Sequence, residues 1–211
     1  FYSDSENRAV VNIGGVANLT ILPAGGPVTG HDCGPGNCLM DGWTRRQLQK
    51  DFDNNGRWAA KGELDTGLLS RMLEDSYFRQ APPKSTGLEY FSMAWLDQML
   101  GETPPAAINV QSTLTELSAQ AIADSLAVAG LPDRLLVCGG GVHNAFLMQR
   151  LATALPGVEV ESTAKYGTDP DWIEGLLFAW LARERLYERA QDTAAITGSN
   201  HPVLMGVIHQ P

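Results

Sequence analysis

The first third of the chain alternates apolar and polar positions in three short segments divided by glycine. Ala9–Ile13 and Ala17–Leu22 flank the pair Gly14-Gly15, and Val28–Cys33 ends at the run Gly34-Pro35-Gly36-Asn37. β-Branched residues on both sides of a Gly-Gly pair are typical of a hairpin. We therefore expect three antiparallel strands at the start of the chain.

Farther along, the apolar positions recur every three or four residues, which is the period of a helix. The first expected helix carries four apolar side chains near one face: Leu39, Met40, Trp43 and Leu48. Short helices are expected over residues 65–74 and 90–100. The pattern Thr113-x-x-Glu116 is a capping box, so a longer helix is expected to open there.

The second half of the chain alternates strands with helices. Leu135–Cys138 is expected to be a short buried strand that ends at Gly139–Gly141. Asn144 is placed to cap a helix that runs to Leu155, because asparagine is a preferred N-cap residue. Val158–Val160 is the next expected strand.

Asp169-Pro170 is expected to open the last long helix, because proline suits the first helical position. Four large side chains form its expected apolar stripe: Trp172, Leu176, Trp180 and Tyr187. By their spacing, its two tryptophans are expected to be core residues on a helix face. Three strands followed by strand-helix units are typical of a mixed sheet covered by helices. The predicted fold class is therefore α/β.

Composition and charge narrow the possible functions. Over 211 residues, 44% are hydrophobic and 18% are charged, which is typical of a globular protein. The net charge of -9 repels phosphate backbones and anionic lipids, so we expect neither a nucleic-acid nor a membrane partner. The three cysteines form no CxxC pair, which favours a cytoplasmic location. Because no initiator methionine is present, the chain is expected to begin within a longer protein.

Three glycine-rich clusters each follow an expected strand, at residues 12–15, 32–37 and 139–144. Glycine lets the backbone approach a ligand closely, and successive free N–H groups at such turns form anion-binding concavities. A helix N-terminus adds a favourable dipole. The clusters therefore indicate phosphate binding, with simple tight turns as the alternative.

These clusters, in this order, resemble the second half of the actin-like ATPase and sugar-kinase superfamily. Residues 12–15, Asn-Ile-Gly-Gly, are similar to the hairpin that grips phosphates there, and residues 137–144 to the motif that packs against adenosine. Four longer motifs narrow the resemblance to the anhydro-N-acetylmuramic acid kinases. They are residues 11–20, residues 32–37 with Asp41, residues 82–87 and residues 169–174.

The resemblance implies a ribonuclease H-like fold, in which an antiparallel three-strand unit and parallel strands form a mixed sheet flanked by helices. It also implies an activity. Such enzymes use ATP, Mg²⁺ and water to open the 1,6-anhydro ring of anhydro-N-acetylmuramic acid and to phosphorylate O6. The product, N-acetylmuramic acid 6-phosphate, belongs to peptidoglycan recycling in the cytoplasm, and the full-length enzymes are usually homodimers.

The resemblance extends only to the family's second half. The Gly-Thr-Ser-x-Asp-Gly phosphate loop and the family's general base do not occur in this sequence. Residues 1–211 are therefore expected to be the C-terminal nucleotide-binding domain of a two-domain kinase, without a catalytic base and inactive alone. Leu88 stands where the family commonly has arginine. The alternatives are a non-catalytic nucleotide-binding module, a pseudokinase, or another sugar kinase of the superfamily.

The resemblance also assigns site residues by number. The phosphate-binding set is Asn12, Gly14, Gly15, Asp32, Gly34, Gly36 and Asn37. Asp32 is also the expected Mg²⁺ ligand, because Mg²⁺ takes few carboxylates plus waters. The adenosine-binding set is Gly139, Gly140, Gly141 and Asn144, and Glu174 is expected to face the sugar. Turn formation, close packing and helix capping are the structural alternatives. For Asp41 and Glu174, in the first turns of helices, the alternative is the helix dipole.

Overall fold

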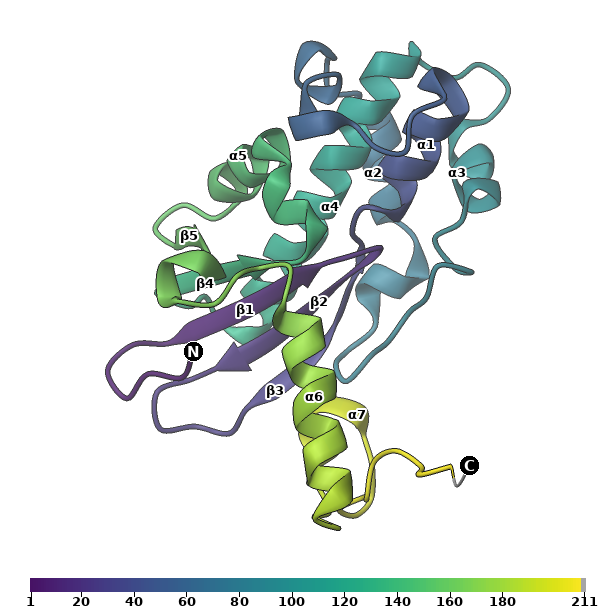
Figure 1. Ribbon diagram of the computed structural model, residues 1–211. Helices are drawn as coiled ribbons and strands as arrows, with labels where there is room; N and C mark the ends of the chain where they lie inside the picture. Colours follow the sequence, from purple (N-terminus) through teal and green to yellow (C-terminus); the bar gives the residue numbers. More distant parts are fainter. Residues whose placement is uncertain (210–211) are drawn as a thin grey trace.

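The computed structural model describes residues 1–209 and contains a five-stranded mixed sheet (Figure 1). The strands are β1 Arg8–Ile13, β2 Val16–Leu22, β3 Thr29–Pro35, β4 Arg134–Cys138 and β5 Glu159–Ser162. Their order across the sheet is β3-β2-β1-β4-β5. The first three pair antiparallel, whereas β4 joins β1 and β5 joins β4 in parallel. The predicted α/β class and its mixed sheet are confirmed.

The helices within the described residues are α1 Cys38–Leu48, α2 Thr66–Leu73, α3 Met93–Leu100, α4 Ala107–Ala129, α5 Ala145–Ala154, α6 Ile173–Leu186 and α7 Ala194–Thr197. The helices predicted near residues 39–48 and 65–74 and after Asn144 are confirmed. Asn144 caps α5 as expected, since its Oδ1 accepts the N–H of Leu147 at 3.0 Å. No helix of residues 1–209 combines the length and apolar character that crossing a membrane requires.

One face of the sheet forms the main hydrophobic core. On β1, the side chains of Ala9, Val11 and Ile13 alternate inward and are fully buried. The long helix α4 packs against β2 and β3 and contributes Leu114 and Leu117 to the same core. Helices α1, α2 and α5 contact α4 in turn, and Figure 1 shows them gathered on its side of the sheet. The core therefore holds the hairpin and α1 in fixed positions.

The capping box predicted at Thr113 is wrong. Helix α4 begins at Ala107, so Thr113 lies inside the helix and is fully buried. Its hydroxyl donates to the carbonyl of Asn109 at 2.7 Å and accepts the N–H of Asp65 at 3.0 Å. Glu116 pairs with Arg150 on α5 instead of reaching back to a cap. The pattern reflects contacts between elements and not a helix end.

The predicted role of the last long helix in the core is also wrong. Helix α6 begins at Ile173 and not at the expected Asp169-Pro170. The carbonyl of Pro170 accepts the N–H of Gly139 at 3.0 Å. The four side chains of its expected stripe are between 41% and 67% exposed. Figure 1 shows α6 running away from the sheet. Among residues 1–209, no other helix or strand covers its apolar stripe. Exposed apolar stripes of this kind mark interaction surfaces or aggregation sites.

The exposure of α6 gives a direct stability test. Leu177 on α6 is 50% exposed, whereas Leu117 on α4 is fully buried. We expect Leu177→Ala to change the free energy of unfolding by less than about 0.5 kcal/mol. The same truncation at Leu117 is expected to cost about 2–5 kcal/mol, because it leaves a cavity in the core. Urea unfolding of both variants measures the difference, and equal losses would contradict the exposed position of α6.

Candidate functional site

The β1–β2 hairpin is fastened to the start of α1 by backbone hydrogen bonds. Asn37 donates its N–H to the carbonyl of Gly14 at 2.7 Å, and Gly36 donates to Gly15 at 2.9 Å. The Asn37 side chain adds a bond from Nδ2 to the carbonyl of Ile13 at 2.9 Å. Gly36 and Asn37 were predicted to bind phosphate, but these N–H groups hold the hairpin. Their contact with phosphate stays a prediction.

Two glycines of the third cluster allow this cluster to pack against the end of β1. A Cβ at Gly139, which has a φ of 76°, would collide with the side-chain oxygen of Asn12. A Cβ at Gly141 would overlap the side chain of Ile13. At Gly140 the nearest atom to such a Cβ is Nδ2 of Asn37, at 3.7 Å. Gly139 and Gly141 therefore serve close packing, whereas Gly140 has open space beside it.

Three oxygen-bearing side chains share the sheet face opposite the α4 core. Asn12 pairs with Asn18 across β1 and β2, and Asn18 pairs with Asp32 across β2 and β3. A register shift in this second ladder gives β3 an extra residue between Asp32 and Gly34. Such bulges redirect side chains near functional sites, and this one places Asp32, not Cys33, opposite Asn18. Carboxylate and amide oxygens are suitable Mg²⁺ ligands.

Asp32 also has a structural role that the sequence did not indicate. Its Oδ2 accepts the N–H of Thr86 at 2.9 Å, and its own N–H donates to the carbonyl of Lys84 at 3.0 Å. These bonds hold residues 84–86 against β3, and Leu88, two residues after Thr86, lies against the hairpin. A Cβ at Gly15 would meet Cδ2 of Leu88 at 2.7 Å, and the Leu88 side chain is 58% exposed. One Asp32 oxygen is left for a metal ion.

A cavity of about 440 Å³ opens beside the hairpin and α1. Its lining residues are Asn37, Asp41, Phe52, Asp53, Asn54, Asn55, Gly140, His143 and Asn144. Three predicted nucleotide-site residues, Asn37, Gly140 and Asn144, thus come together here. Residues 52–55 and His143 were missed, because they lie in a polar loop and a short turn that carry no periodic signal. The open volume is in the range of small-molecule sites.

Several polar side chains of this cavity are occupied by structural bonds. Asp53 accepts the N–H groups of Trp58 and Ala59, each at 2.9 Å. Asn55 uses its Oδ1 to accept the N–H of Ala145 at 3.3 Å. The Asp53 bonds fold the loop after α1 on itself, and the Asn55 bond joins this loop to the first turn of α5. The cavity is therefore held open by contacts between segments about ninety residues apart in sequence.

Asp41 lines the cavity from the first turn of α1. Burial raises the pKa of its carboxyl group to about 6, and this effect exceeds the lowering by Arg45. The carboxylates of Asp51 and Asp53 raise the pKa further. A helix dipole would lower it. Burial therefore dominates the pKa of Asp41, and the helix dipole stays the structural alternative for its role.

The start of α6 is tied to the same region. His143 Nε2 lies 2.9 Å from Oδ1 of Asp171, just before α6. The sequence indicated no role for this histidine, because the pair forms only when α5 and α6 are placed in space. Glu174, the predicted sugar ligand, is exposed in the first turn of α6. Its role stays a prediction.

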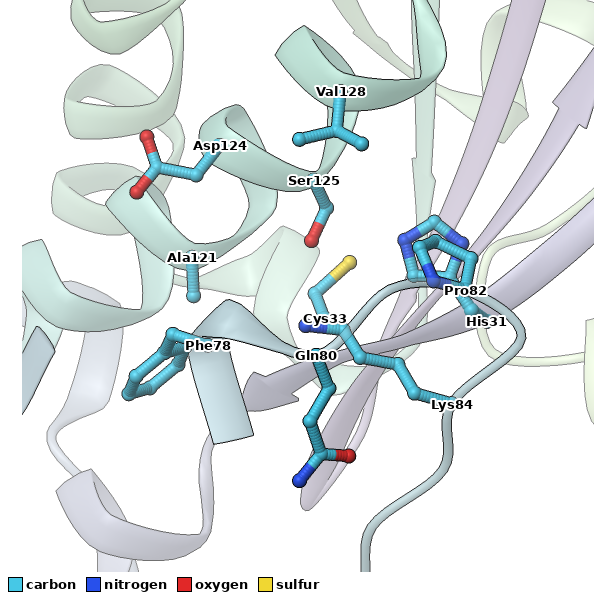
Figure 2. A pocket seen from close by; sticks show the side chains of 10 residues that line it. All are labelled: His31, Cys33, Phe78, Gln80, Pro82, Lys84, Ala121, Asp124, Ser125 and Val128. Atoms are coloured by element: carbon cyan, nitrogen blue, oxygen red, sulfur yellow. The ribbon is translucent and has the colours of Figure 1, made fainter. Parts of the chain in front are cut away.

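A second, much smaller cavity lies between β3 and α4 (Figure 2). Its volume is about 60 Å³, which leaves room for about two waters and not for a nucleotide. Figure 2 shows the Cys33 sulfur pointing towards Ser125. Burial raises the pKa of the Cys33 thiol to about 12, so this thiol is not a reactive nucleophile. Of these two cavities, the larger one is the candidate ligand site, because three predicted nucleotide-site residues line it.

Comparison with known proteins identifies the family. The model of the family described as anhydro-N-acetylmuramic acid kinase matches residues 1–211. The chain belongs to this family. It is 47% identical over 209 residues to the anhydro-N-acetylmuramic acid kinase of Xylella fastidiosa, with 98% of this chain and 55% of that protein covered. It is also 47% identical over 211 residues to the enzyme of that name from Pseudomonas fluorescens, with 99% and 58% covered.

The chain thus spans just over half the length of these curated relatives. This share tells how much of each relative is matched, but it does not tell which part of the relative is matched. The assignment of residues 1–211 to the C-terminal domain therefore stays a prediction.

A solved structure supports the predicted fold. The activator of the 2-hydroxyisocaproyl-CoA dehydratase from Clostridium difficile, with bound ADPNP, superposes with a TM-score of 0.53. The alignment covers 89% of this chain and 65% of the activator at 14% identity. At this identity the likeness concerns the fold alone. The actin-like ATPase fold predicted from the glycine clusters is confirmed.

Glycine packing in the third cluster can be tested by paired substitutions. Gly141→Ala is expected to lower the free energy of unfolding by about 1–3 kcal/mol, because the new methyl group overlaps Ile13. Gly140→Ala is the matched control and is expected to leave stability nearly unchanged, because its Cβ has space. Thermal or urea unfolding measures both. Similar losses for the two variants would show that the packing does not distinguish these glycines.

The raised pKa of Asp41 predicts a pH-dependent cost to stability. Its carboxyl has a pKa of about 6 when folded and an ordinary value of 3.8. The folded state therefore binds this proton more tightly, so stability falls as pH rises from about 4 to 6. Asp41→Asn is expected to stabilise the chain by about 1 kcal/mol at pH 7.5, after allowance for partial exposure. The gain should fall by about half at pH 5. Urea unfolding at both pH values checks this, and an equal gain at both would contradict it.

Proposed function

We propose that this chain supplies the nucleotide site of an ATP-dependent kinase that acts on anhydro-N-acetylmuramic acid. Water adds at C1 of the sugar, the bond from C1 to the bridging oxygen breaks, and O6 receives the γ-phosphoryl group. The products are N-acetylmuramic acid 6-phosphate and ADP. The observation that carries this proposal is the family match over residues 1–211, and the cavity beside the glycine hairpin supports it.

The proposed site has three parts. The hairpin residues Asn12, Gly14 and Gly15 bind the β- and γ-phosphates, chiefly through the Asn12 amide and the Gly15 N–H, because the N–H of Gly14 already donates to the carbonyl of Val16 at 3.2 Å. The larger cavity takes the nucleoside. Asp32, whose register partner across β2 and β3 is Asn18, is proposed to hold Mg²⁺. When bound, the ion would neutralise charge on the phosphates. The free Asp32 oxygen and the neighbouring amide oxygen fit this role.

Glu174 is proposed to contact the sugar, since the start of α6 is linked to the third cluster by the bond between Gly139 and Pro170. We place the general base in a part of the protein outside this chain. The chain alone is therefore proposed to bind ATP without turnover. A cytoplasmic location and a homodimeric full-length enzyme belong to the same proposal.

A non-catalytic nucleotide-binding module is the second candidate function. The observation in its favour is Leu88, an apolar side chain that lies against the hairpin where phosphates are expected. An apolar group there supplies no hydrogen bond to phosphate oxygens. This candidate keeps the nucleotide site and omits phosphoryl transfer.

A coupled ADP-release assay tests the proposal. The chain is incubated with Mg-ATP and anhydro-N-acetylmuramic acid, alone and with the separately produced remaining segment of the Xylella fastidiosa relative. We expect turnover only in the combined reaction. Turnover by the chain alone would contradict the placement of the base outside it. ATP binding without turnover in either reaction, with both parts folded, would favour the binding module.

Replacement of Leu88 by arginine is expected to strengthen ATP binding at the proposed nucleotide site. Leu88→Arg places a guanidinium beside the hairpin, where it can donate charge-assisted hydrogen bonds to phosphate. We expect ATP affinity to rise about tenfold, measured by isothermal titration calorimetry. Leu88→Gln is the matched control, since it adds a polar group without charge, and a smaller effect is expected. Equal or absent effects would show that residue 88 does not face the phosphates.

A further inference from the structure

Asp41 is distinguished among the ionisable residues of the larger cavity. Asp53 is bonded to two backbone N–H groups, and His143 is paired with Asp171. Within residues 1–209 the Asp41 carboxyl group has no side-chain hydrogen bond or ion pair, and Arg45 attracts it only from beyond contact distance. A partly buried carboxyl without a hydrogen-bond partner loses hydration, and the attraction of Arg45 offsets only part of that loss. Its position in an open cavity points to a ligand that supplies the missing donors.

The distance from the hairpin indicates which part of a nucleotide reaches Asp41. The carbonyl of Asn37 accepts the N–H of Asp41 at 2.8 Å, so the two residues are one helical turn apart. Four residues of α-helix advance about 6 Å along the axis. Asn37 itself is bonded to Gly14 of the proposed phosphate hairpin. The group beside Asp41 therefore follows directly after the phosphates, and in a nucleotide that group is the ribose.

The far side of the cavity suits a base. Phe52, which is 58% exposed, and the Asn54 side chain lie on its lining. An exposed aromatic ring offers a stacking surface for a planar base, and such stacking is worth about 1–3 kcal/mol per base in single-stranded nucleic-acid sites. With phosphates at the hairpin and the base at Phe52, the hydroxyl-bearing sugar lies between them. Asp41 is the acceptor at that position.

We propose that the Asp41 carboxylate accepts hydrogen bonds from the ribose hydroxyls of the bound nucleotide and thereby selects ribonucleotides over deoxyribonucleotides. The inference rests on the proposed function, because it takes the ligand to be ATP. Adjacent hydroxyls are paired donors that match the two oxygens of a carboxylate. Carboxylates at other nucleotide sites bind ribose in the same manner.

The experiment measures affinities of the 211-residue chain for ATP and for 2′,3′-dideoxy-ATP by isothermal titration calorimetry with Mg²⁺. Wild type, Asp41→Ala and Asp41→Asn are compared. Asp51→Ala is the matched control, because it removes the same charge from an exposed position outside the cavity lining. Circular dichroism and thermal unfolding establish that each variant is folded before its affinity is compared.

We expect wild type to bind ATP about tenfold more tightly than the dideoxy analogue, since a hydrogen bond to a charged group is worth at least this factor. Asp41→Ala should lose this preference while its affinity for the analogue stays unchanged. Asp51→Ala should retain the preference. If Asp41→Ala weakens both ligands equally, or neither, the ribose assignment is overturned and the nucleotide site stands. If wild type binds neither ligand, the proposed function fails and the inference with it.

Discussion

The candidate site depends on the close approach of three backbone segments. The hairpin between β1 and β2, the start of α1 and the turn after β4 meet at the end of β1. Asn37 bonds to Gly14 and Ile13 from one side, and Gly139 and Gly141 pack against Asn12 and Ile13 from the other. Side chains at these glycines would separate the segments. The cavity exists because the segments are held together while Gly140 leaves space.

The polar groups around the cavity are of two kinds: some are hydrogen-bonded within the protein, and others are available to a ligand. The N–H groups at the start of α1 and the carboxylate of Asp53 are bonded within the protein, so they fix the cavity walls. Within residues 1–209 the carboxyl group of Asp41 has no hydrogen-bond partner, and its ionised form is penalised by burial. Functional sites commonly retain such groups at a cost in stability. The bulge in β3 places Asp32 opposite Asn18 in the ladder between β2 and β3.

The sequence predicted the features that depend on local pattern. The Gly-Gly hairpin, the strand before Gly139 and the Asn144 cap follow from neighbouring residues, and the structure contains all three. The start of α4 was mispredicted, because Thr113 and Glu116 resemble a cap but serve contacts with Asp65 and Arg150.

Other features depend on contacts that sequence patterns do not carry. Asn55 lies beside Ala145 only because the loop after α1 folds against α5, and this contact places residues 52–55 in the cavity. The apolar stripe of α6 was predicted correctly as apolar but wrongly as buried, since periodicity does not say what covers a helix face. The glycines of the site were predicted from the sequence, whereas the side chains of residues 52–55 and His143 that line the cavity were not.

Hydrogen–deuterium exchange with and without Mg-ATP tests most directly whether the larger cavity is the nucleotide site. The expected result is slower exchange confined to residues 12–15, 37–41, 52–55 and 140–144. These segments are far apart in sequence, so protection of all four requires a ligand at their junction. Protection centred on the small cavity around Lys84, or no protection in any of the four segments, would contradict the assignment.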